Sequence, residues 1–472
     1  MIHTRFPNRL VMLGFGSIGQ GVLPLILRHI DIAPTNITIV TAEPRGKEVA
    51  AQYGIRFIEQ AATLENYRAL LTPMLQKGDF LLNLSVDVGS VALMQLCQEL
   101  DVLYLDTVVE PWAGGYTDPS LSPSQRSNYA MREAAIALRG MAAGGPTAIT
   151  AHGANPGLVS HFVKQALLDI ARDTGAPVAT PPPCADRAAW AQIAEQLGVK
   201  VIHIAERDTQ VGDRPKKPGE FVNTWSVDGF VGEGCQPAEL GWGTHEKALP
   251  ADGRRHESGC DAAIYLLRPG ASTRVRTWTP LEGPFHGFLI THNESISLAD
   301  YFTARNADGS VRYRPTAHYA YHPCDDAVLS VHELAGKNWE MQPEKRLMTD
   351  EIVRGMDELG VLLMGHKKGA YWYGSRLTID QARKLAPHNN ATSLQVTVAV
   401  LAGVIWAMEN PRRGIVESDE MDYARILEIC RPYLGEVVGV YSDWTPLQGR
   451  AVLFPEALDT ADPWQFSNIR VV

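Results

Sequence analysis

The feature that most constrains this chain is an alternation of short β-rich runs with helix-length segments over residues 10–151. The β-rich runs are Leu10 to Leu13, Ile37 to Val40, Phe80 to Leu84, Val102 to Leu105 and Thr147 to Thr150. Strands that alternate with helices in this way predict a doubly wound parallel sheet. We therefore expect an α/β fold that begins with a Rossmann-like sheet.

A glycine-rich turn, Gly14-Phe15-Gly16-Ser17-Ile18-Gly19, joins the first run to an apolar-periodic helix over residues 20–28. In such a turn the first glycine permits the tight bend and the second lets the backbone approach a pyrophosphate. The third lets the helix pack on the strand, and the helix N-terminus faces the phosphates. The order of strand, turn and helix predicts a dinucleotide-binding unit.

The second strand of such a unit usually ends in an acid that binds the ribose hydroxyls of NAD. Here Thr41 follows Val40, and the acid, Glu43, comes two positions later. Arg45 and Lys47 follow closely and could bind a ribose 2′-phosphate. The sequence favours NAD and leaves NADP open.

The 472 residues, 45% of them hydrophobic, are enough for two domains. We expect an NAD-binding domain over residues 1–154 and a second, α+β domain over residues 155–472. A helix over residues 157–174 and a proline-rich connection over residues 176–187 follow the first domain. A buried helix near residues 392–408 could pack back on the first domain.

The second domain contains strand-like runs with few helices between them, which predicts a largely antiparallel sheet. These runs are Val201 to Ala205, Phe221 to Val227, Ala262 to Leu267, Thr273 to Trp278 and Phe285 to Thr291.

The formal net charge of −10 argues against a nucleic-acid or acidic-membrane partner and mildly favours a cationic substrate. The six cysteines show neither a C-x-x-C pair nor a zinc spacing, which is typical of reduced thiols in a cytoplasmic protein. The N-terminus has no apolar signal region, and the apolar stretch over residues 394–408 is too short to span a membrane. We expect a cytoplasmic protein.

Two histidines, His318 and His322, lie four positions apart, but the β-rich residues around them argue against a helical metal pair. We expect no metal. Neither a G-x-S-x-G turn nor a P-loop occurs, which removes the usual hydrolase and nucleotide-hydrolysing classes.

Polar clusters follow three predicted strands, at the sheet edge where a cofactor's reactive part lies. They are Asn83 to Asp87, Asp106 to Trp112 and Gly153 to Gly157. Asp87 and Glu110 are equally compatible with solvated loop acids. Asn155, fixed before Pro156, is the better candidate for a contact with a nicotinamide.

The second domain adds Glu206, Trp225, Glu233 and His292. Each of these alone is more often structural than functional. Together, carboxylates, an aromatic face and an imidazole form a set that suits a protonated amine.

These residues carry a resemblance to the bacterial homospermidine synthases, NAD-dependent polyamine-forming enzymes related to the saccharopine dehydrogenase group. The similar blocks cover nearly the whole chain: residues 14–19, 83–87, 106–112, 153–157, 203–210, 221–230, 236–247, 291–297, 319–330, 357–363, 371–375 and 441–447.

The resemblance implies a redox-neutral transfer. NAD+ takes a hydride from the carbon next to one amine of putrescine or spermidine, and the resulting imine reacts with a second putrescine. Ammonia or diaminopropane leaves, and NADH reduces the new Schiff base to sym-homospermidine. The resemblance also implies a homodimer.

The resemblance further implies roles for the candidate residues. It places Asp87, Glu110 and Glu233 near the bound amine, Glu206 in substrate binding or proton transfer, Asn155 and His292 beside the nicotinamide, and Trp225 against the cationic centre. Asp357 is a weaker candidate for drawing polyamines toward the entrance. The implied cofactor contacts are Gly14, Gly16, Ser17, Ile18, Gly19, Thr41, Glu43, Ser85, Thr107, Ala154, Asn155 and Pro156.

One departure from the family pattern and two alternatives remain open. Family members have an aspartate where this chain has Thr41. A dehydrogenase of the carboxynorspermidine or saccharopine type would turn over NAD(P)H and would need arginines for a substrate carboxylate. A non-catalytic sensor of NAD and polyamines would not need Trp225 and His292 near the nicotinamide.

Overall fold

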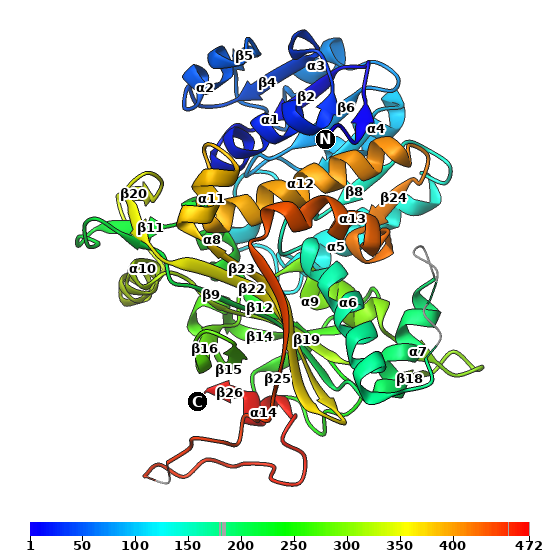
Figure 1. Cartoon of the computed structure of the whole chain (residues 1–472), viewed down its shortest axis with the longest axis vertical. Helices are drawn as coiled ribbons and strands as arrows, with labels where there is room; N and C mark the ends of the chain where they lie inside the picture. Colours follow the sequence, from blue (N-terminus) through cyan, green and yellow to red (C-terminus); the bar gives the residue numbers. More distant parts are fainter. Residues whose placement is uncertain (179–180, 182–185, 452, 472) are drawn as a thin grey trace.

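The computed structural model describes residues 1–178, 181, 186–451 and 453–471. Its first sheet is parallel throughout and runs in the order β24-β8-β7-β6-β2-β4-β5. The bounds are Ile415–Glu417 (β24), Ala148–Thr150 (β8), Leu103–Asp106 (β7), Phe80–Asn83 (β6), Leu10–Leu13 (β2), Ile37–Thr41 (β4) and Arg56–Glu59 (β5). This order and the helices on both faces confirm the predicted doubly wound sheet (Figure 1).

Alternate residues of each strand supply the two faces of this sheet. Leu10 and Met12 of β2 point into one core, and Val11 and Leu13 point into the other. The helices of this region are Ser17–His29 (α1), Lys47–Gln52 (α2), Tyr67–Leu71 (α3), Ser90–Leu100 (α4) and Asn128–Ala137 (α5). Because both faces are covered, the strands are apolar along their whole length.

The second sheet runs β13-β14-β12-β19-β9-β22-β23-β25, and β15, β16 and β26 extend it beside β19. Its bounds are Gly253–Arg255 (β13), Ala263–Pro269 (β14), Pro237–Gly241 (β12), Thr316–His322 (β19), Val201–Asp208 (β9), Met356–His366 (β22), Gly369–Thr378 (β23), Glu436–Ser442 (β25), Arg274–Thr279 (β15), Gly283–Phe288 (β16) and Arg470–Val471 (β26). Neighbours are antiparallel except β19 and β9, so the largely antiparallel sheet is confirmed.

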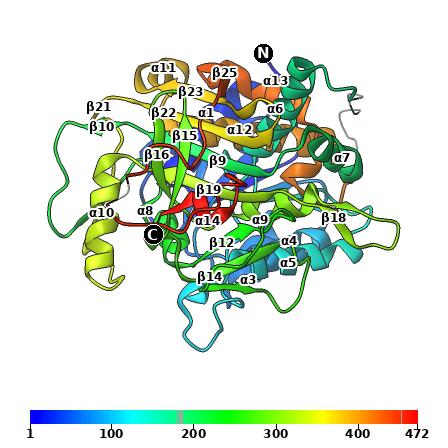
Figure 2. The ribbon, with the colours of Figure 1, turned by 90° about the horizontal axis from the view of Figure 1, so that it is seen from below.

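Helices flank the second sheet, whose strands β22, β9, β19, β12 and β14 follow one another in Figure 2. These helices are Leu158–Thr174 (α6), Arg187–Leu197 (α7), Val227–Cys235 (α8), Asn293–Tyr301 (α9), Asp325–Gly336 (α10) and Phe466–Ile469 (α14). Small strand pairs complete the structure: Thr4–Arg5 (β1) with Ile30–Asp31 (β3), Val211–Gly212 (β10) with Ile352–Arg354 (β21), Glu220–Asn223 (β11) with Glu344–Leu347 (β20), and Ala304–Arg305 (β17) with Val311–Tyr313 (β18).

Two strand predictions were wrong in extent. The run over 221–227 ends as a strand at Asn223, because Ser226 caps α8 by accepting a hydrogen bond from the backbone N–H of Gly229. The run over 285–291 ends at Phe288, and α9 begins at Asn293. The proline-rich connection predicted over residues 176–187 lies largely outside the described residues.

The apolar helix α12 (Ala391–Glu409) lies between the two sheets, as Figure 1 shows in orange. It contacts α1, β7 and β8 on one side and β22 and β23 on the other. The prediction that this stretch is too short to span a membrane was wrong, because the helix extends over 19 residues and is long and apolar enough to cross one. However, 89% of its most apolar window is buried inside the protein. The neighbouring helices are Ile379–Leu385 (α11) and Tyr423–Cys430 (α13).

The chain returns to the first sheet late, because β24 pairs with β8. We propose that the first domain consists of residues 1–154 together with the returning segment that carries α12 and β24. The rest of the chain forms the second domain.

Candidate active site

The glycine turn lies between β2 and α1, and each of its three glycines has a different environment. A Cβ on Gly14, which has a φ of +89°, would come within 2.6 Å of the backbone of Leu84 and Ser85. A Cβ on Gly19 would meet Gly14 O and the Phe15 ring at 3.0 Å. A Cβ on Gly16 would meet nothing within 4 Å. Gly16 therefore faces open space at the N-terminus of α1, where a pyrophosphate would lie.

A buried hydrogen-bond network joins the carboxyl ends of the next three strands. Asn83 donates through Nδ2 to the Tyr104 hydroxyl at 3.2 Å, and this hydroxyl donates to Asp106 at 2.8 Å. The other oxygen of Asp106 accepts the backbone N–H of Ala151 at 2.6 Å. Ser85 donates its hydroxyl to Asn83. The network fixes the starts of the three loops that carry the predicted cofactor contacts Ser85, Thr107 and residues 154–156.

The last of these loops reaches the second domain. Asn155 donates through Nδ2 to Oε2 of Glu206 at 2.8 Å. Ala154 is buried, and Pro156 follows Asn155 in a cis peptide. Asn155, in the loop after β8, and Glu206, on β9 of the second sheet, are therefore in direct contact.

Glu206 belongs to a face of the second sheet that also carries two tyrosines of β19. Tyr319 donates its hydroxyl to Glu206, and Tyr321 accepts a hydrogen bond from Nε1 of Trp225 at 3.0 Å. The two tyrosine rings stack with centroids 5.1 Å apart. Burial raises the pKa of Glu206 to about 7, although the hydrogen bonds from Tyr319 and Asn155 lower it. Glu206 can therefore gain or lose a proton near neutral pH.

His292 caps the start of α9 between two carboxylates. Its Nε2 lies 2.9 Å from Glu233 and its Nδ1 lies 3.2 Å from Glu294. Burial alone lowers the pKa of His292, but the two carboxylates outweigh it and raise the pKa to about 10. The ring also packs against Tyr319, with centroids 4.5 Å apart. His292 is therefore an imidazolium that links Glu233 to the Glu206 cluster.

Glu110 lies on the first-domain side of this cluster. Burial, followed by the charges of Glu233 and Asp87, raises its pKa to about 8. Its Oε2 atom is buried and has no hydrogen-bond partner among the described residues. Asp87 is more exposed and has a φ of 63°. An unpartnered buried carboxyl oxygen beside two acids is suited to a cationic group.

The entrance role predicted for Asp357 is wrong. Asp357 is fully buried on β22, directly opposite Asp208 of β9. Its carboxyl accepts a hydrogen bond from Thr392 of α12 at 2.6 Å. A fully buried side chain has no access to the entrance.

Sequence reasoning missed three residues of this face: Asp208, Tyr319 and Tyr321. Each lies two positions from another member of the face along a strand, and side chains at that spacing point to the same side. Period-two spacing on the predicted strand would have paired Asp208 with Glu206.

The remaining predicted cofactor contacts lie around the glycine turn and the loop ends. Ser17 and Ile18 open α1, and Thr107 follows β7. Thr41 ends β4, and Glu43 is exposed just beyond it. The open approach at Gly16 and the helix N-terminus fit a dinucleotide, with Glu43 free to reach the ribose side.

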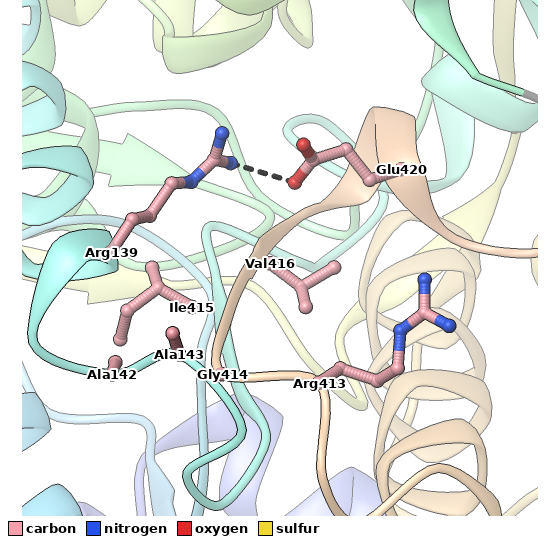
Figure 3. Close-up of a pocket in the computed structure, with 8 residues that line it drawn as sticks. All are labelled: Arg139, Ala142, Ala143, Arg413, Gly414, Ile415, Val416 and Glu420. Carbon is pink, nitrogen blue, oxygen red and sulfur yellow. Dashed lines mark hydrogen bonds and ion pairs between the residues drawn. The ribbon is translucent and has the colours of Figure 1, made fainter.

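A surface hollow of about 250 Å³ lies elsewhere, at the outer strand β24 of the first sheet (Figure 3). Arg139 and Glu420 form an ion pair at its edge, with an N···O distance of 2.6 Å. Its lining contains none of the candidate residues: it consists of Arg139, Ala142, Ala143, Arg413, Gly414, Ile415, Val416 and Glu420.

The fold and the site together define a two-domain, NAD(P)-binding enzyme of the saccharopine dehydrogenase group. Residues 10–149 match the family model "Saccharopine dehydrogenase NADP binding domain", and residues 153–441 match "Saccharopine dehydrogenase C-terminal domain". Within this group, the chain belongs to the homospermidine synthase family.

The relatives support this placement over the full length. The chain is 56% identical to the homospermidine synthase of Blastochloris viridis and 55% identical to that of Mesorhizobium japonicum, covering all of this chain and 98% of each relative. The crystal structure of homospermidine synthase from Legionella pneumophila in complex with NAD superimposes with a TM-score of 0.92 at 50% identity, covering 99% of this chain and 98% of that one. Saccharopine dehydrogenase from Saccharomyces cerevisiae shares the fold alone, with a TM-score of 0.53 at 11% identity over 92% of this chain and 100% of that one.

Proposed function

We propose that this chain is an NAD-dependent homospermidine synthase that transfers an aminobutyl group from putrescine or spermidine to putrescine. The observation that carries the proposal is the contact between Asn155, in the loop that follows β8 of the nucleotide-binding sheet, and Glu206 of the acidic, aromatic face. This contact brings the cofactor side and the amine side of the site together. When bound, NAD+ accepts a hydride from the amine-bearing carbon of the donor and returns it to the product.

Two opposite demands on the substrate nitrogens require separate groups. The reacting ammonium must lose a proton before hydride leaves its carbon, and the distal ammonium must stay charged and anchored. Glu206, whose pKa burial raises to about 7, is suited to take and return the first proton. Glu110, Glu233 and Asp87 are suited to hold the second ammonium.

Trp225 and His292 have complementary roles in this proposal. The indole, held edge-on by Tyr321, would lie against the cationic centre, a contact worth about 2 kcal/mol when desolvated. The His292 imidazolium keeps Glu233 in place at 2.9 Å. Asn155 would orient the nicotinamide from its loop.

The same set of residues disfavours the two alternatives. A dehydrogenase of the saccharopine type needs basic side chains for a substrate carboxylate, and the face around Glu206 carries acids and aromatic rings instead. A non-catalytic sensor has no use for an acid–base group with a pKa near neutrality.

We also propose that the protein acts as a homodimer in the cytoplasm. The resemblance to the family supports the dimer, and the scattered cysteines support a reducing compartment. Analytical ultracentrifugation of the purified protein tests the dimer.

The proposal is tested by incubating the purified protein with putrescine and a catalytic amount of NAD+. We expect homospermidine and ammonia in equal amounts, with no build-up of NADH. Stoichiometric NADH would instead identify a dehydrogenase, and NAD binding with no product would identify a sensor.

A further inference from the structure

Three carboxyl groups lie together on one face of the second sheet, and only Glu206 has a role so far. Glu206 and Asp208 are two positions apart on β9. Asp357 lies on the neighbouring strand β22, directly opposite Asp208. All three side chains are almost completely buried. Three charges at this spacing would repel one another strongly in the interior, so at least one of these groups must hold a proton.

Hydrogen bonds favour the ionised form of Asp208 over that of Asp357. Asp208 accepts from the Thr224 hydroxyl at 2.6 Å, from the backbone N–H of Gln210 at 2.8 Å and from the Gln210 amide at 3.1 Å. Burial raises the pKa of Asp208, and these hydrogen bonds together with the Arg207 charge oppose that rise. A carboxylate with three donors and a cation nearby is stable in the charged state.

Asp357 has a much poorer set of donors. Thr392 donates to Oδ2, while Oδ1 is buried and has no hydrogen-bond partner among the described residues. The N-terminus of α12 does not compensate, because the backbone N–H groups of Ala391 and Ser393 donate to Gln210 and Asn390 instead. A charged Asp357 would leave a buried anionic oxygen unsatisfied.

The other groups that face Asp357 do not supply a cation. Tyr319 and Tyr321 of β19 and Glu206 and Asp208 of β9 are its ionisable neighbours, and Gln395 of α12 donates to its backbone oxygen. Within the described ranges, Asp357 forms no ion pair with a lysine, arginine or histidine. Burial, Glu206 and Asp208 together hold its pKa well above the usual range.

We propose that Asp357 carries a proton at neutral pH. As a neutral acid on the same face of the sheet as Glu206, it is a positioning residue for the Glu206 carboxyl. A proton on Oδ1 turns this orphaned atom into a donor that the Glu206 carboxylate can accept. It also removes one of the two charges that would otherwise oppose ionisation of Glu206. The role in the reaction rests on the proposed function, whereas the protonation of Asp357 does not.

Infrared difference spectroscopy at neutral pH tests the protonation directly. A protonated carboxyl gives a C=O stretching band that a carboxylate lacks. We expect Asp357→Asn to lose one such band and Asp208→Asn to keep it. If Asp357→Asn loses a carboxylate band and keeps every protonated band, the proposal is wrong. Glu110→Gln is the control, because it removes a different protonated carboxyl.

A second variant keeps the test decisive if Asp357→Asn does not fold. Thr392→Val removes the hydroxyl that donates to Oδ2 and leaves the carboxyl itself in place. We expect the Asp357 band to remain and to move to higher frequency as this hydrogen bond is lost. A spectrum of protonated carboxyls identical to that of the wild type would overturn the proposal.

The pH dependence of kcat then tests the positioning role. Asp208→Asn removes a real charge, so the acid limb set by Glu206 moves down by about one pH unit. Asp357→Asn replaces a neutral acid by a neutral amide, so the limb stays within a few tenths of a unit. A downward shift in Asp357→Asn as large as in Asp208→Asn would contradict the role. An infrared band at Asp357 in a protein that makes no homospermidine would instead count against the proposed function alone.

Discussion

At the scale of single residues, the site depends on a few side chains with unusual surroundings. Trp225 is only partly buried, its indole N–H donates to Tyr321, and its ring packs near Phe230 with centroids 5.5 Å apart. His292 lies between two carboxylates, and Glu110 has a buried oxygen without a partner. Ionisable groups with perturbed surroundings of this kind gather at functional sites, which is why they indicate function.

Trp225→Ala should lower kcat for homospermidine formation about thirtyfold while NAD affinity stays within a factor of two. The variant loses a cation–π contact worth about 2 kcal/mol, and each increase of about 1.4 kcal/mol in the activation free energy lowers the rate tenfold. Initial rates and fluorescence titration with NAD measure the two effects. Trp225→Phe, which keeps an aromatic face, serves as the control and should recover much of the rate. An unchanged rate in the alanine variant would return Trp225 to a packing role.

Glu233→Gln should raise the KM for putrescine roughly tenfold or more, because a charge-assisted contact contributes about 1.5–3 kcal/mol. The same change removes one of the two carboxylates beside His292 and lowers the pKa of the imidazole. Steady-state kinetics measures the first effect, and NMR titration of the His292 ring measures the second. Equal KM values for the variant and the wild type would remove Glu233 from the amine site.

At the scale of elements, local patterns predicted the fold well where the structure is set by neighbouring residues. The strand β2, the glycine turn and α1 follow one another along the chain, so their geometry is fixed locally. The strand β24 was not predicted, because it has three residues and gains its stability only by pairing with β8 from a distant part of the chain.

In the candidate site, too, local features could be predicted and features set by long-range contacts could not. Asn155 and Glu206 were predicted from strand ends and similarity, but their contact depends on how the two domains meet. The resemblance suggested an entrance role for Asp357, and a lone acid in a sequence carries no information on burial that could correct it. Its true position follows from the register of β22 on β9, which long-range pairing sets.

The glycine turn gives a matched pair of variants. Gly16→Ala should keep the wild-type melting temperature and weaken NAD binding at least about tenfold, because its Cβ enters only the space left for the pyrophosphate. Gly14→Ala should lower the melting temperature as well, because its Cβ meets backbone atoms at 2.6 Å. Thermal unfolding and NAD titration check both variants. Wild-type NAD affinity in Gly16→Ala would place the pyrophosphate elsewhere.

At the scale of the whole molecule, a buried ion network joins the domains. Arg132 of α5 donates to Glu417 of β24 at 2.6 Å and to Asp300 of α9 at 2.9 Å. The side chain is 2% exposed. The late-returning strand β24 and the second domain are thus bound to the same guanidinium.

Arg132→Met should reduce the free energy of unfolding by about 3 kcal/mol, because it removes the buried cation that Glu417 and Asp300 share and leaves them only the more exposed Arg139 and Arg187. Urea denaturation followed by circular dichroism measures the change. The exposed pair of Arg68 and Glu99 provides the control, since Arg68→Met should move the midpoint very little. Equal effects of the two variants would show that the buried network does not hold the domains together.

We propose that the bound cofactor is reduced and reoxidised within one turnover. The most direct test uses putrescine deuterated at both carbons next to nitrogen, with excess unlabelled NADH in solution. If the account is right, the homospermidine formed retains all of its deuterium, because the hydride taken from the donor is returned to the same carbon. Homospermidine that has lost deuterium to hydrogen from the NADH pool would contradict it.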